Sequence, residues 1–323
     1  MKKPTLAEVK NYLDESNAFN FRGAELKIVS AHNHLIYRAE KNNAVYAIRM
    51  TNPESYRARE WISMGEEFEI LRAIEKTGLG PKAYYLDKTF RVPFLIQEFV
   101  EADCFNILKP LSVYHLERAA WAIAQLNLAD ITPKALPFMS QYQEKSLMKS
   151  VFVWQARLAD SVRRNIKKDV LGWAAKIAPL TARAAWKLSR YSYLFAGSKF
   201  FFHFDGAHCG NVYLRNGRAI FLDWQKVSLR SDPTFTLVRF MVSVEKNGEV
   251  SNFLFNTLLS SYLEVNLVKN FFEMAHARLL ERQVSDLVWV LWNYTCRQDQ
   301  RPVEEATNIA ARYESVLNSI RSF

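Results

Sequence analysis

Residues 201–225, FFHFDGAHCGNVYLRNGRAIFLDWQ, place several chemically active side chains between two apolar runs. Both runs have the composition of buried strands, and a core seldom holds so many polar groups. Three interpretations are open: hydrogen-bonded core and turn residues, ligands of a transition metal, or the working groups of a catalyst. The side chains in question are His203, Asp205, His208, Asn211 and Asp223.

The spacing of these residues favours the catalytic interpretation. Asn216-Gly217 is the dipeptide preferred in two-residue type I′ turns, so the sequence on either side predicts a β-hairpin. Such a hairpin brings Asn211 and Asp223, at its outer ends, close together. Amide and carboxylate oxygens suit Mg²⁺, which shares the phosphates of a nucleotide. A further carboxylate, Asp205, can orient a hydroxyl and accept its proton, as phosphoryl transfer requires.

The competing interpretations explain less of the pattern. Turn and capping roles account for each residue separately, but not for their order along the chain. A transition-metal site built on His203, Asp205 and His208 would need another ligand, and the sequence has no further His or Cys cluster to supply one.

The elements that would carry these residues begin with a small sheet. Thr5 and Glu8 form a capping box for a helix that ends near Ser16. Residues 26–50 read as three strands, and residues 57–76 as a helix stopped by TGLGP. Two more strands are expected within KAYYLDKT and VPFLIQEFV.

The chain changes character after Glu101, where helical patterns dominate and the only clear strands are those of 201–225. We therefore expect an α+β protein with two lobes. A five-stranded nucleotide-binding lobe would span 1–101, and a larger helical lobe with the catalytic loop and acceptor site would span 102–323. A cleft between two such lobes is a common location for ligands.

These segments resemble a known family. HFDGAHCGN followed by FLDW is similar to the H-G-D-x-H-x-x-N and I-D-W motifs of the aminoglycoside phosphotransferases and choline kinases, which have a protein-kinase-like fold. YAIRM, EEFEILRAI, GPKAYYLD and FLIQEFVEA resemble, in order, the third strand, the following helix, the next strand and the hinge. SDPTFTLVRF resembles the segment that supports the catalytic loop, so the resemblance covers most of the chain.

The resemblance implies catalytic, metal-binding and phosphate-binding roles for five residues. Asp205 would be the catalytic carboxylate, and Asn211 and Asp223 would hold Mg²⁺. Arg49 would bind phosphate, with Glu67 on the next helix as its partner; Glu66 and Glu69 compete with Glu67 for this role.

The same resemblance implies contacts for a nucleotide base. The carbonyl of Glu98 and the amide of Val100 would bond adenine, while His203 would brace the catalytic loop through a backbone hydrogen bond. The implied activity is transfer of the γ-phosphate of ATP or GTP to a hydroxyl of a small molecule.

The sequence departs from the family pattern at four places, and three of them, the lengthened catalytic loop, the glycine-free phosphate loop and Thr236, support an alternative: a pseudokinase that binds nucleotide or a partner without catalysis. Five residues rather than four separate Asp205 from Asn211, and Gly206 or Gly210 would have to absorb the extra one. The phosphate loop SAHNHL lacks glycine, and either Asn33 or His34 could fill its polar position. Arg49 replaces the family's lysine, which permits bidentate contact with phosphate. Thr236 stands where a supporting Asp is expected.

The net charge of +10 is concentrated in residues 141–200, where twelve Lys and Arg face three acids, a local +9. A solvated helix face is the main expectation, because the basic residues lie largely off an apolar stripe. A surface for RNA, a membrane or an anionic substrate is the alternative. The stripe recurs at helical spacing: Leu147, Val151, Trp154, Leu158, Val162 and Ile166.

Composition and length also suggest a cellular location. The sequence shows no signal-peptide h-region and no apolar run long enough to span a bilayer. Its three cysteines, Cys104, Cys209 and Cys296, lack disulfide or zinc spacing, which favours a reducing, cytoplasmic setting. Near the C-terminus, Trp289, Trp292, Tyr294 and Asp299 could line an acceptor site, although core packing explains them equally well.

Overall fold

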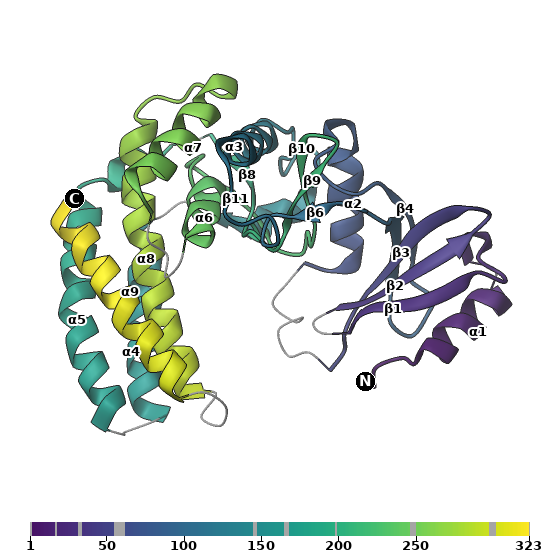
Figure 1. Ribbon diagram of the computed structural model, residues 1–323, viewed down its shortest axis with the longest axis horizontal. Helices are drawn as coiled ribbons and strands as arrows, with labels where there is room; N and C mark the ends of the chain where they lie inside the picture. The colour runs from purple at the N-terminus through teal and green to yellow at the C-terminus, as the bar shows by residue number, and fades with distance from the viewer. Residues whose placement is uncertain are drawn as a thin grey trace. The chain divides into compact units, whose positions relative to one another are not determined.

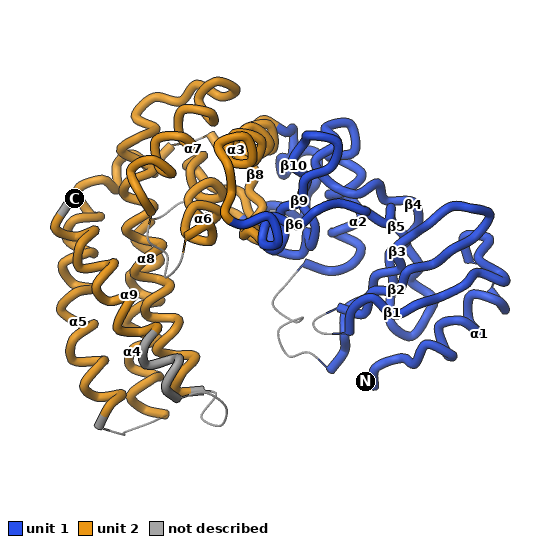
Figure 2. Tube along the Cα trace, viewed as in Figure 1, with its two compact units in different colours: residues 1–109, 129–142, 210–227 blue, residues 110–128, 143–209, 228–323 orange. Residues whose placement is uncertain are grey.

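The computed structural model has mixed helices and strands (Figure 1), and its contacts divide the chain into two compact units (Figure 2). The first unit comprises residues 1–109, 129–142 and 210–227; the second comprises 110–128, 143–209 and 228–323. The structure describes residues 2–16, 18–31, 34–54, 62–144, 147–164, 168–197, 199–245, 250–296 and 302–322.

Five strands form the antiparallel sheet of the first unit, in the order β1-β2-β3-β5-β4. Helix α2 (Met64–Ile74) lies between β3 and β4 in the sequence. The predicted five-strand sheet with one intervening helix, and the α+β class, are therefore confirmed. The strands are β1 (Glu25–Ala31), β2 (His34–Lys41), β3 (Ala44–Thr51), β4 (Ala83–Asp87) and β5 (Phe94–Glu98).

Local sequence signals account for the ends of these elements. In α1 (Leu6–Ser16), the Glu8 amide donates to Thr5 Oγ1 at 3.2 Å and the Thr5 amide donates to Glu8 Oε2 at 2.7 Å, as the capping box predicts. Helix α2 begins later than expected, at Met64, because Ser63 and Glu66 form its capping box. Residues 57–61 of the predicted helix lie outside the described residues.

A second, three-stranded sheet in the first unit contains the predicted hairpin. Strands β9 (Val212–Arg215) and β10 (Arg218–Phe221) pair in antiparallel register, and β6 (Asp103–Cys104) pairs with β9. Asn216 and Gly217 have φ values of 50° and 75°, the positive values that a type I′ turn requires. The Phe221 amide donates to the Leu79 carbonyl at 2.8 Å, which ties the hairpin to the segment after α2.

The second unit is mainly helical, and its described helices are α3 (Val113–Asn127), α4 (Lys149–Arg164), α5 (Lys168–Ser189), α6 (Phe235–Val244), α7 (Asn252–Val265), α8 (Phe271–Cys296) and α9 (Pro302–Ser322). Helices α4, α5, α8 and α9 lie side by side in Figure 1. They share one apolar core, which includes Trp154, Leu158, Leu287 and Val288. Of the predicted stripe, Leu147, Val151, Trp154 and Leu158 pack in this core, and Ile166 lies outside the described residues.

A third sheet contains two strands, β7 and β11, that the sequence analysis missed, as it also missed β6. β8 (Phe201–Phe204), β11 (Val227–Arg230) and β7 (Gln143–Glu144) form a sheet in the order β7-β11-β8. β7 and β11 are parallel, with Arg230 opposite Glu144. Our expectation that 201–225 held the only clear strands beyond residue 101 was therefore wrong, because two- and four-residue strands give no periodic signal.

The C-terminal aromatic residues make polar contacts with the basic helices. Trp292 Nε1 donates to Asp160 Oδ2 at 2.7 Å, and the Tyr294 hydroxyl donates to Asp169 Oδ2 at 2.7 Å. Their polar atoms therefore serve helix packing, which favours the packing interpretation for this pair; Asp299 lies outside the described residues. No described helix is long and apolar enough to cross a membrane.

Candidate active site

A cavity of about 350 Å³ lies within the first unit and gathers most of the predicted site residues. Its walls come from β1, β2, β3, β5, the segment after β5, and the β9–β10 hairpin. Apolar side chains such as Ile36, Ala47 and Leu222 supply part of the lining. The predicted residues on the cavity wall are Arg49, Glu98, Val100, Asn211 and Asp223.

Arg49 lies between two carboxylates. It is buried on β3, with Nη1 3.3 Å from Glu67 Oε1, and its Nη2 is paired with Asp223 Oδ1. Burial alone would lower the pKa of Arg49, but the carboxylates of Glu67 and Asp223 raise it above the usual value. The guanidinium is therefore charged, and its planar fork is held at the cavity wall.

Glu67 is the acid of α2 that meets Arg49. Glu66 instead accepts from the Ser63 amide at 2.7 Å in the capping box, and Glu69 is exposed. Glu67 is 0% exposed, and burial raises its pKa to about 7 although Arg49 acts in the opposite direction. Of the three acids that the sequence left in competition, Glu67 is thus the one that pairs with Arg49.

Asn211 and Asp223 stand at the two outer ends of the hairpin and line the same cavity. The Leu222 amide donates to the Asn211 carbonyl at 3.0 Å, so the hairpin ladder extends to these ends. Burial raises the pKa of Asp223, but the charge and hydrogen bond of Arg49 lower it by more, so the net direction is downward. The Asp223 side chain is 42% exposed.

This donor set fits Mg²⁺. One amide oxygen and one ionised carboxylate are hard ligands, and Mg²⁺ in nucleotide sites usually takes one or two protein carboxylates with waters and phosphates. Among the described residues, no group of three or more His, Cys, Asp and Glu could hold a metal ion. The transition-metal interpretation therefore gains no support from the part of the chain that is described.

His34 is the loop residue that reaches this site. Its Nε2 lies 3.5 Å from Asp223 Oδ1, and its Nδ1 lies 3.4 Å from Gln225 Nε2. Burial lowers the pKa of His34 to about 3, so the imidazole is neutral. Asn33, the other candidate for this position, and His32 lie outside the described residues.

Glu98 and Val100 occupy the end of β5 and the irregular segment after it. The Glu98 amide donates to the Lys82 carbonyl at 2.8 Å, and its carboxylate accepts from the Lys82 amide and from Arg215. These contacts fix the backbone at the cavity wall. Bonds from this segment to an adenine ring stay a prediction.

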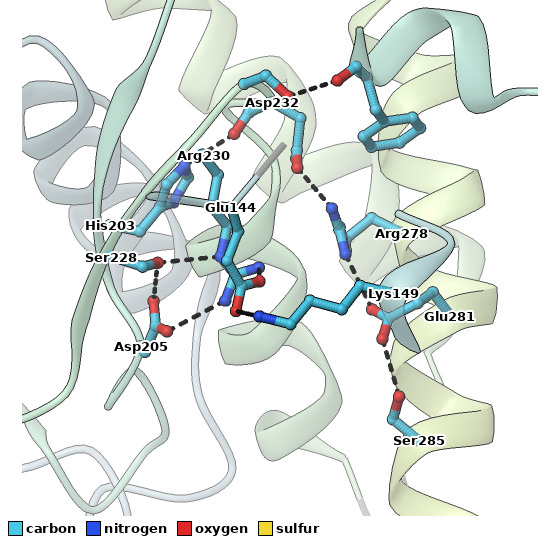
Figure 3. A network of polar contacts seen from close by, with 12 residues as sticks. Glu144, Lys149, His203, Asp205, Ser228, Arg230, Asp232, Arg278, Glu281 and Ser285 are labelled. Atoms are coloured by element: carbon cyan, nitrogen blue, oxygen red, sulfur yellow. Dashed lines mark hydrogen bonds and ion pairs between the residues drawn. The ribbon is translucent and has the colours of Figure 1, made fainter. Parts of the chain in front are cut away.

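Asp205 belongs to the second unit, directly after β8, where both of its carboxylate oxygens are bonded (Figure 3). Ser228 Oγ donates to Oδ1 at 2.7 Å, and Arg230 Nη2 donates to Oδ2 at 3.2 Å. Burial raises the pKa of Asp205, but Arg230 and Ser228 lower it, with a net shift below the usual value. Asp205 is therefore an ionised carboxylate with a defined orientation.

His203 braces the same region through the backbone bond that the resemblance implied. Its Nε2 lies 2.7 Å from the Asp232 carbonyl, which can only accept, so Nε2 carries the proton. Its Nδ1 then accepts, and Thr236 Oγ1 at 2.9 Å is the donor. Burial lowers the pKa of His203 to about 4, which keeps the ring neutral. Thr236, which replaces the expected Asp, therefore has a physical role.

The residues that connect these groups were missed by sequence reasoning. Arg278 of α8 donates through Nη2 to Asp232 Oδ2 at 2.6 Å and through Nη1 to Glu281 Oε2 at 3.2 Å. Arg230 pairs with Glu144 as well as with Asp205. The one available signal was an Arg at the end of the buried run VSLR, where a charge needs a partner.

The lengthened segment between Asp205 and Asn211 does not use a positive-φ glycine to accommodate its extra residue. Neither Gly206 nor Gly210 adopts a positive φ. Instead, the Ala207 amide donates to the Phe204 carbonyl at 3.2 Å, and the Cys209 amide donates to Ser243 Oγ at 3.0 Å. Contacts with α6 therefore fix this segment as far as Cys209.

The fold defined by these elements is one found among small-molecule kinases. No family model and no curated protein sequence matches the chain. Solved structures do match it at 12–14% identity, and this likeness confirms the predicted protein-kinase-like fold.

Three of these structures illustrate the match. A putative aminoglycoside phosphotransferase from Ralstonia eutropha has a TM-score of 0.68 and 12% identity, covering 97% of each chain. An ethanolamine kinase from Plasmodium vivax has a TM-score of 0.67 and 12% identity, covering 98% of this chain and 89% of its own. A choline kinase from Streptococcus pneumoniae has a TM-score of 0.60 and 13% identity, covering 98% of each chain.

Proposed function

We propose that this protein is a kinase that transfers the γ-phosphoryl group of ATP or GTP to a hydroxyl of a small molecule. One observation carries the proposal: a charged, buried Arg49 is held beside Asn211 and Asp223 in one cavity of the first unit. A fixed cation and two hard oxygen ligands together suit a Mg²⁺-bound polyphosphate.

The proposed binding roles follow from the cavity walls. Arg49 binds the phosphates, with Glu67 holding its side chain in place. Asn211 and Asp223 are the protein ligands of Mg²⁺, and bound Mg²⁺ would neutralise charge on the phosphates. The Glu98 carbonyl and the Val100 amide bond the adenine ring. In this proposal residues 1–101 form the nucleotide-binding lobe and 102–323 the lobe with the catalytic loop.

Asp205 acts on the acceptor. The acceptor hydroxyl oxygen forms a bond to the γ-phosphorus, and the bond from that phosphorus to the β,γ-bridging oxygen breaks. The nucleoside diphosphate leaves with the bond's electron pair, and the hydroxyl proton passes to the Asp205 carboxylate. Support for this role comes from the two hydrogen bonds that fix the carboxylate while leaving its side chain 21% exposed.

The names of similar structures suggest acceptors for a first screen. They include ethanolamine, choline and aminopropanol kinases and a spectinomycin phosphotransferase. We therefore propose amino alcohols and amino sugars first, followed by sugars and nucleosides.

A pseudokinase remains the second candidate, favoured by the pairing of Asp223 Oδ1 with both Arg49 and His34. A carboxylate engaged in this way has one oxygen less for a metal ion. Such a protein would bind nucleotide independently of Mg²⁺ and would not turn it over.

The proposal is tested by measuring ADP release from Mg²⁺-ATP over the acceptor panel. We expect turnover with the unmodified protein and a loss of at least about 100-fold in Asp205→Ala, the scale of a removed acid–base group. Nucleotide binding, measured by calorimetry, should persist in Asp205→Ala. Binding that needs no Mg²⁺, together with absent turnover, would favour the pseudokinase instead.

A further inference from the structure

The orientation of the Asp205 carboxylate is fixed by two hydrogen bonds, which proton acceptance alone does not require. Each of its two oxygens accepts one hydrogen bond, from Ser228 and from Arg230, and both donors come from β11. Ser228 and Arg230 are buried, whereas Asp205 retains some exposure. A carboxylate offers about four lone-pair sites, so the two bonds leave room for an acceptor hydroxyl.

Arg230 is itself fixed from several sides. Its Nε donates to Ser228 Oγ at 3.0 Å, its Nη1 pairs with Glu144, and its guanidinium lies 3.5 Å from the centre of the Phe235 ring. The parallel register of β7 and β11 places Glu144 directly opposite Arg230. Figure 3 shows the guanidinium between the two carboxylates. Its charge is therefore shared between Asp205 and Glu144.

We propose that Arg230 and Ser228 are positioning residues for Asp205. We propose also that Glu144, which pairs with the same guanidinium, sets the strength of the interaction between Arg230 and Asp205. The proposal rests on the proposed kinase function, in which Asp205 orients the acceptor. It assigns a role in the reaction to three residues, Glu144, Ser228 and Arg230, that carry no family motif in this sequence.

The charges around Asp205 identify Arg230 as the dominant contact. His203 on β8 is neutral, because burial lowers its pKa to about 4. Arg239 on α6 and Arg282 on α8 also act on Asp205 electrostatically, and Arg282 is already paired with Asp286. Among these cations, Arg230 makes the direct hydrogen bond to Asp205. Removing its charge should raise the pKa of Asp205, and removing the Glu144 charge should lower it.

The test compares the acid limb of kcat against pH, which reports ionisation of the acting group in the enzyme–substrate complex. Arg230→Gln should move this limb to higher pH by about 1 unit, the lower end of the effect of an adjacent Arg on an Asp. Glu144→Gln should move it in the opposite direction. Arg230→Lys should recover part of the shift, and Ser228→Ala should give a smaller upward shift. KM for nucleotide should not change.

The matched control is Asp160→Asn, which removes another carboxylate of the second unit that is paired with arginines, Arg163 and Arg164. Asp160→Asn should leave the pH of the acid limb unchanged. Titration of the nucleotide itself affects all variants equally, so it cannot produce a difference between them. If Arg230→Gln does not fold, Ser228→Ala and Glu144→Gln still test the two opposite directions.

Two failures are distinguishable. Full activity in Asp205→Asn would remove the kinase assignment of Asp205 and the inference with it. Loss of activity in Asp205→Asn, combined with shifts of the same sign or no shift in Arg230→Gln and Glu144→Gln, would overturn the positioning role alone.

Discussion

His203 is neutral in the folded protein near pH 7 because burial lowers its pKa, and each ring nitrogen has a partner that fits the neutral form. The Asp232 carbonyl requires a proton on Nε2, and Thr236 Oγ1 donates to a bare Nδ1. A carboxylate at position 236 would favour the imidazolium instead. Threonine at this position therefore leaves the ring neutral while still bonding to Nδ1.

The neutral state of His203 predicts acid sensitivity. Burial lowers the pKa of His203 to about 4 from 6.5, so the unfolded chain takes up its proton first as pH falls. Stability is lost between these two pH values and changes no further through this group below pH 4. The loss is about 3 kcal/mol, since one pKa unit corresponds to about 1.4 kcal/mol.

Urea unfolding of the unmodified protein and His203→Gln at several pH values between 7 and 4 measures this effect. Glutamine can donate to the Asp232 carbonyl and accept from Thr236 without titrating. The gap in unfolding free energy between the two proteins should therefore close as pH falls. A constant gap would contradict the assignment.

The β9–β10 turn shows an element fixed by local sequence, and its glycine provides a test with a matched control. Gly217 has φ 75°, so Gly217→Ala should destabilise the protein by about 1 kcal/mol. Gly172 lies inside α5 with nothing within 4 Å of an added Cβ, so Gly172→Ala should stabilise by up to about 1 kcal/mol. Urea unfolding curves give both signs, and equal signs would contradict this account.

Elements with a strong local signal could be predicted from sequence, and those held by distant partners could not. The capping box of Thr5 and Glu8 and the Asn216-Gly217 turn depend on neighbours in the chain, and both are confirmed. β7 has two residues and exists only through its pairing with β11. Nothing near Glu144 in the sequence indicates that partner.

In the candidate site, too, some residues could be predicted from sequence and others depend on partners distant in the chain. Residues of the hairpin ends and of β3 could be placed in one cavity because motif order and strand pairing locate them. The sequence analysis named Glu67 but left Glu66 and Glu69 as competitors, because all three lie on one helix, and only the contact with Arg49 distinguishes them. The orientation of Asp205 depends on hydrogen bonds from Ser228 and Arg230. These two residues lie close to Asp205 only because of the position of β11 in the folded chain.

At the scale of the whole molecule, most of the described Lys and Arg side chains of residues 141–200 are exposed, and several have local partners. Asp160 pairs with Arg163 and Arg164, and Arg190 lies 3.8 Å from the centre of the Trp186 ring. Exposed ion pairs of this kind contribute little to stability. These contacts agree with a solvated helix face, while binding of RNA or a membrane by this segment stays a prediction.

The location of the cavity predicts where a nucleotide acts. At a concentration about 100 times its Kd, a ligand that binds only the folded state adds about 2.7 kcal/mol to the unfolding free energy. With Mg²⁺-ADP we expect slower amide hydrogen exchange in β3, β5 and the β9–β10 hairpin, because these elements line the cavity. Exchange in α9, which belongs to the second unit, should change least.

The matched variant for this experiment is Asp223→Asn. It should remove the Mg²⁺-dependent part of the protection and retain a Mg²⁺-independent part contributed by Arg49 and the β5 segment. Equal protection of both units in the unmodified protein, or protection confined to α8 and α9, would contradict a nucleotide site in the first unit.

The first unit is built from three separate stretches of chain, and this has a consequence for synthesis on the ribosome. Cys104 pairs with Tyr213, and the Leu79 carbonyl accepts from the Phe221 amide, so β6 and the segment after α2 gain these partners only when the late hairpin has been made. At the usual rate of translation, the time between synthesis of these early segments and synthesis of the hairpin is on the order of ten seconds. During it the emerging chain carries Arg49 and Glu67 without Asp223, and the cavity cannot exist until the hairpin leaves the exit tunnel.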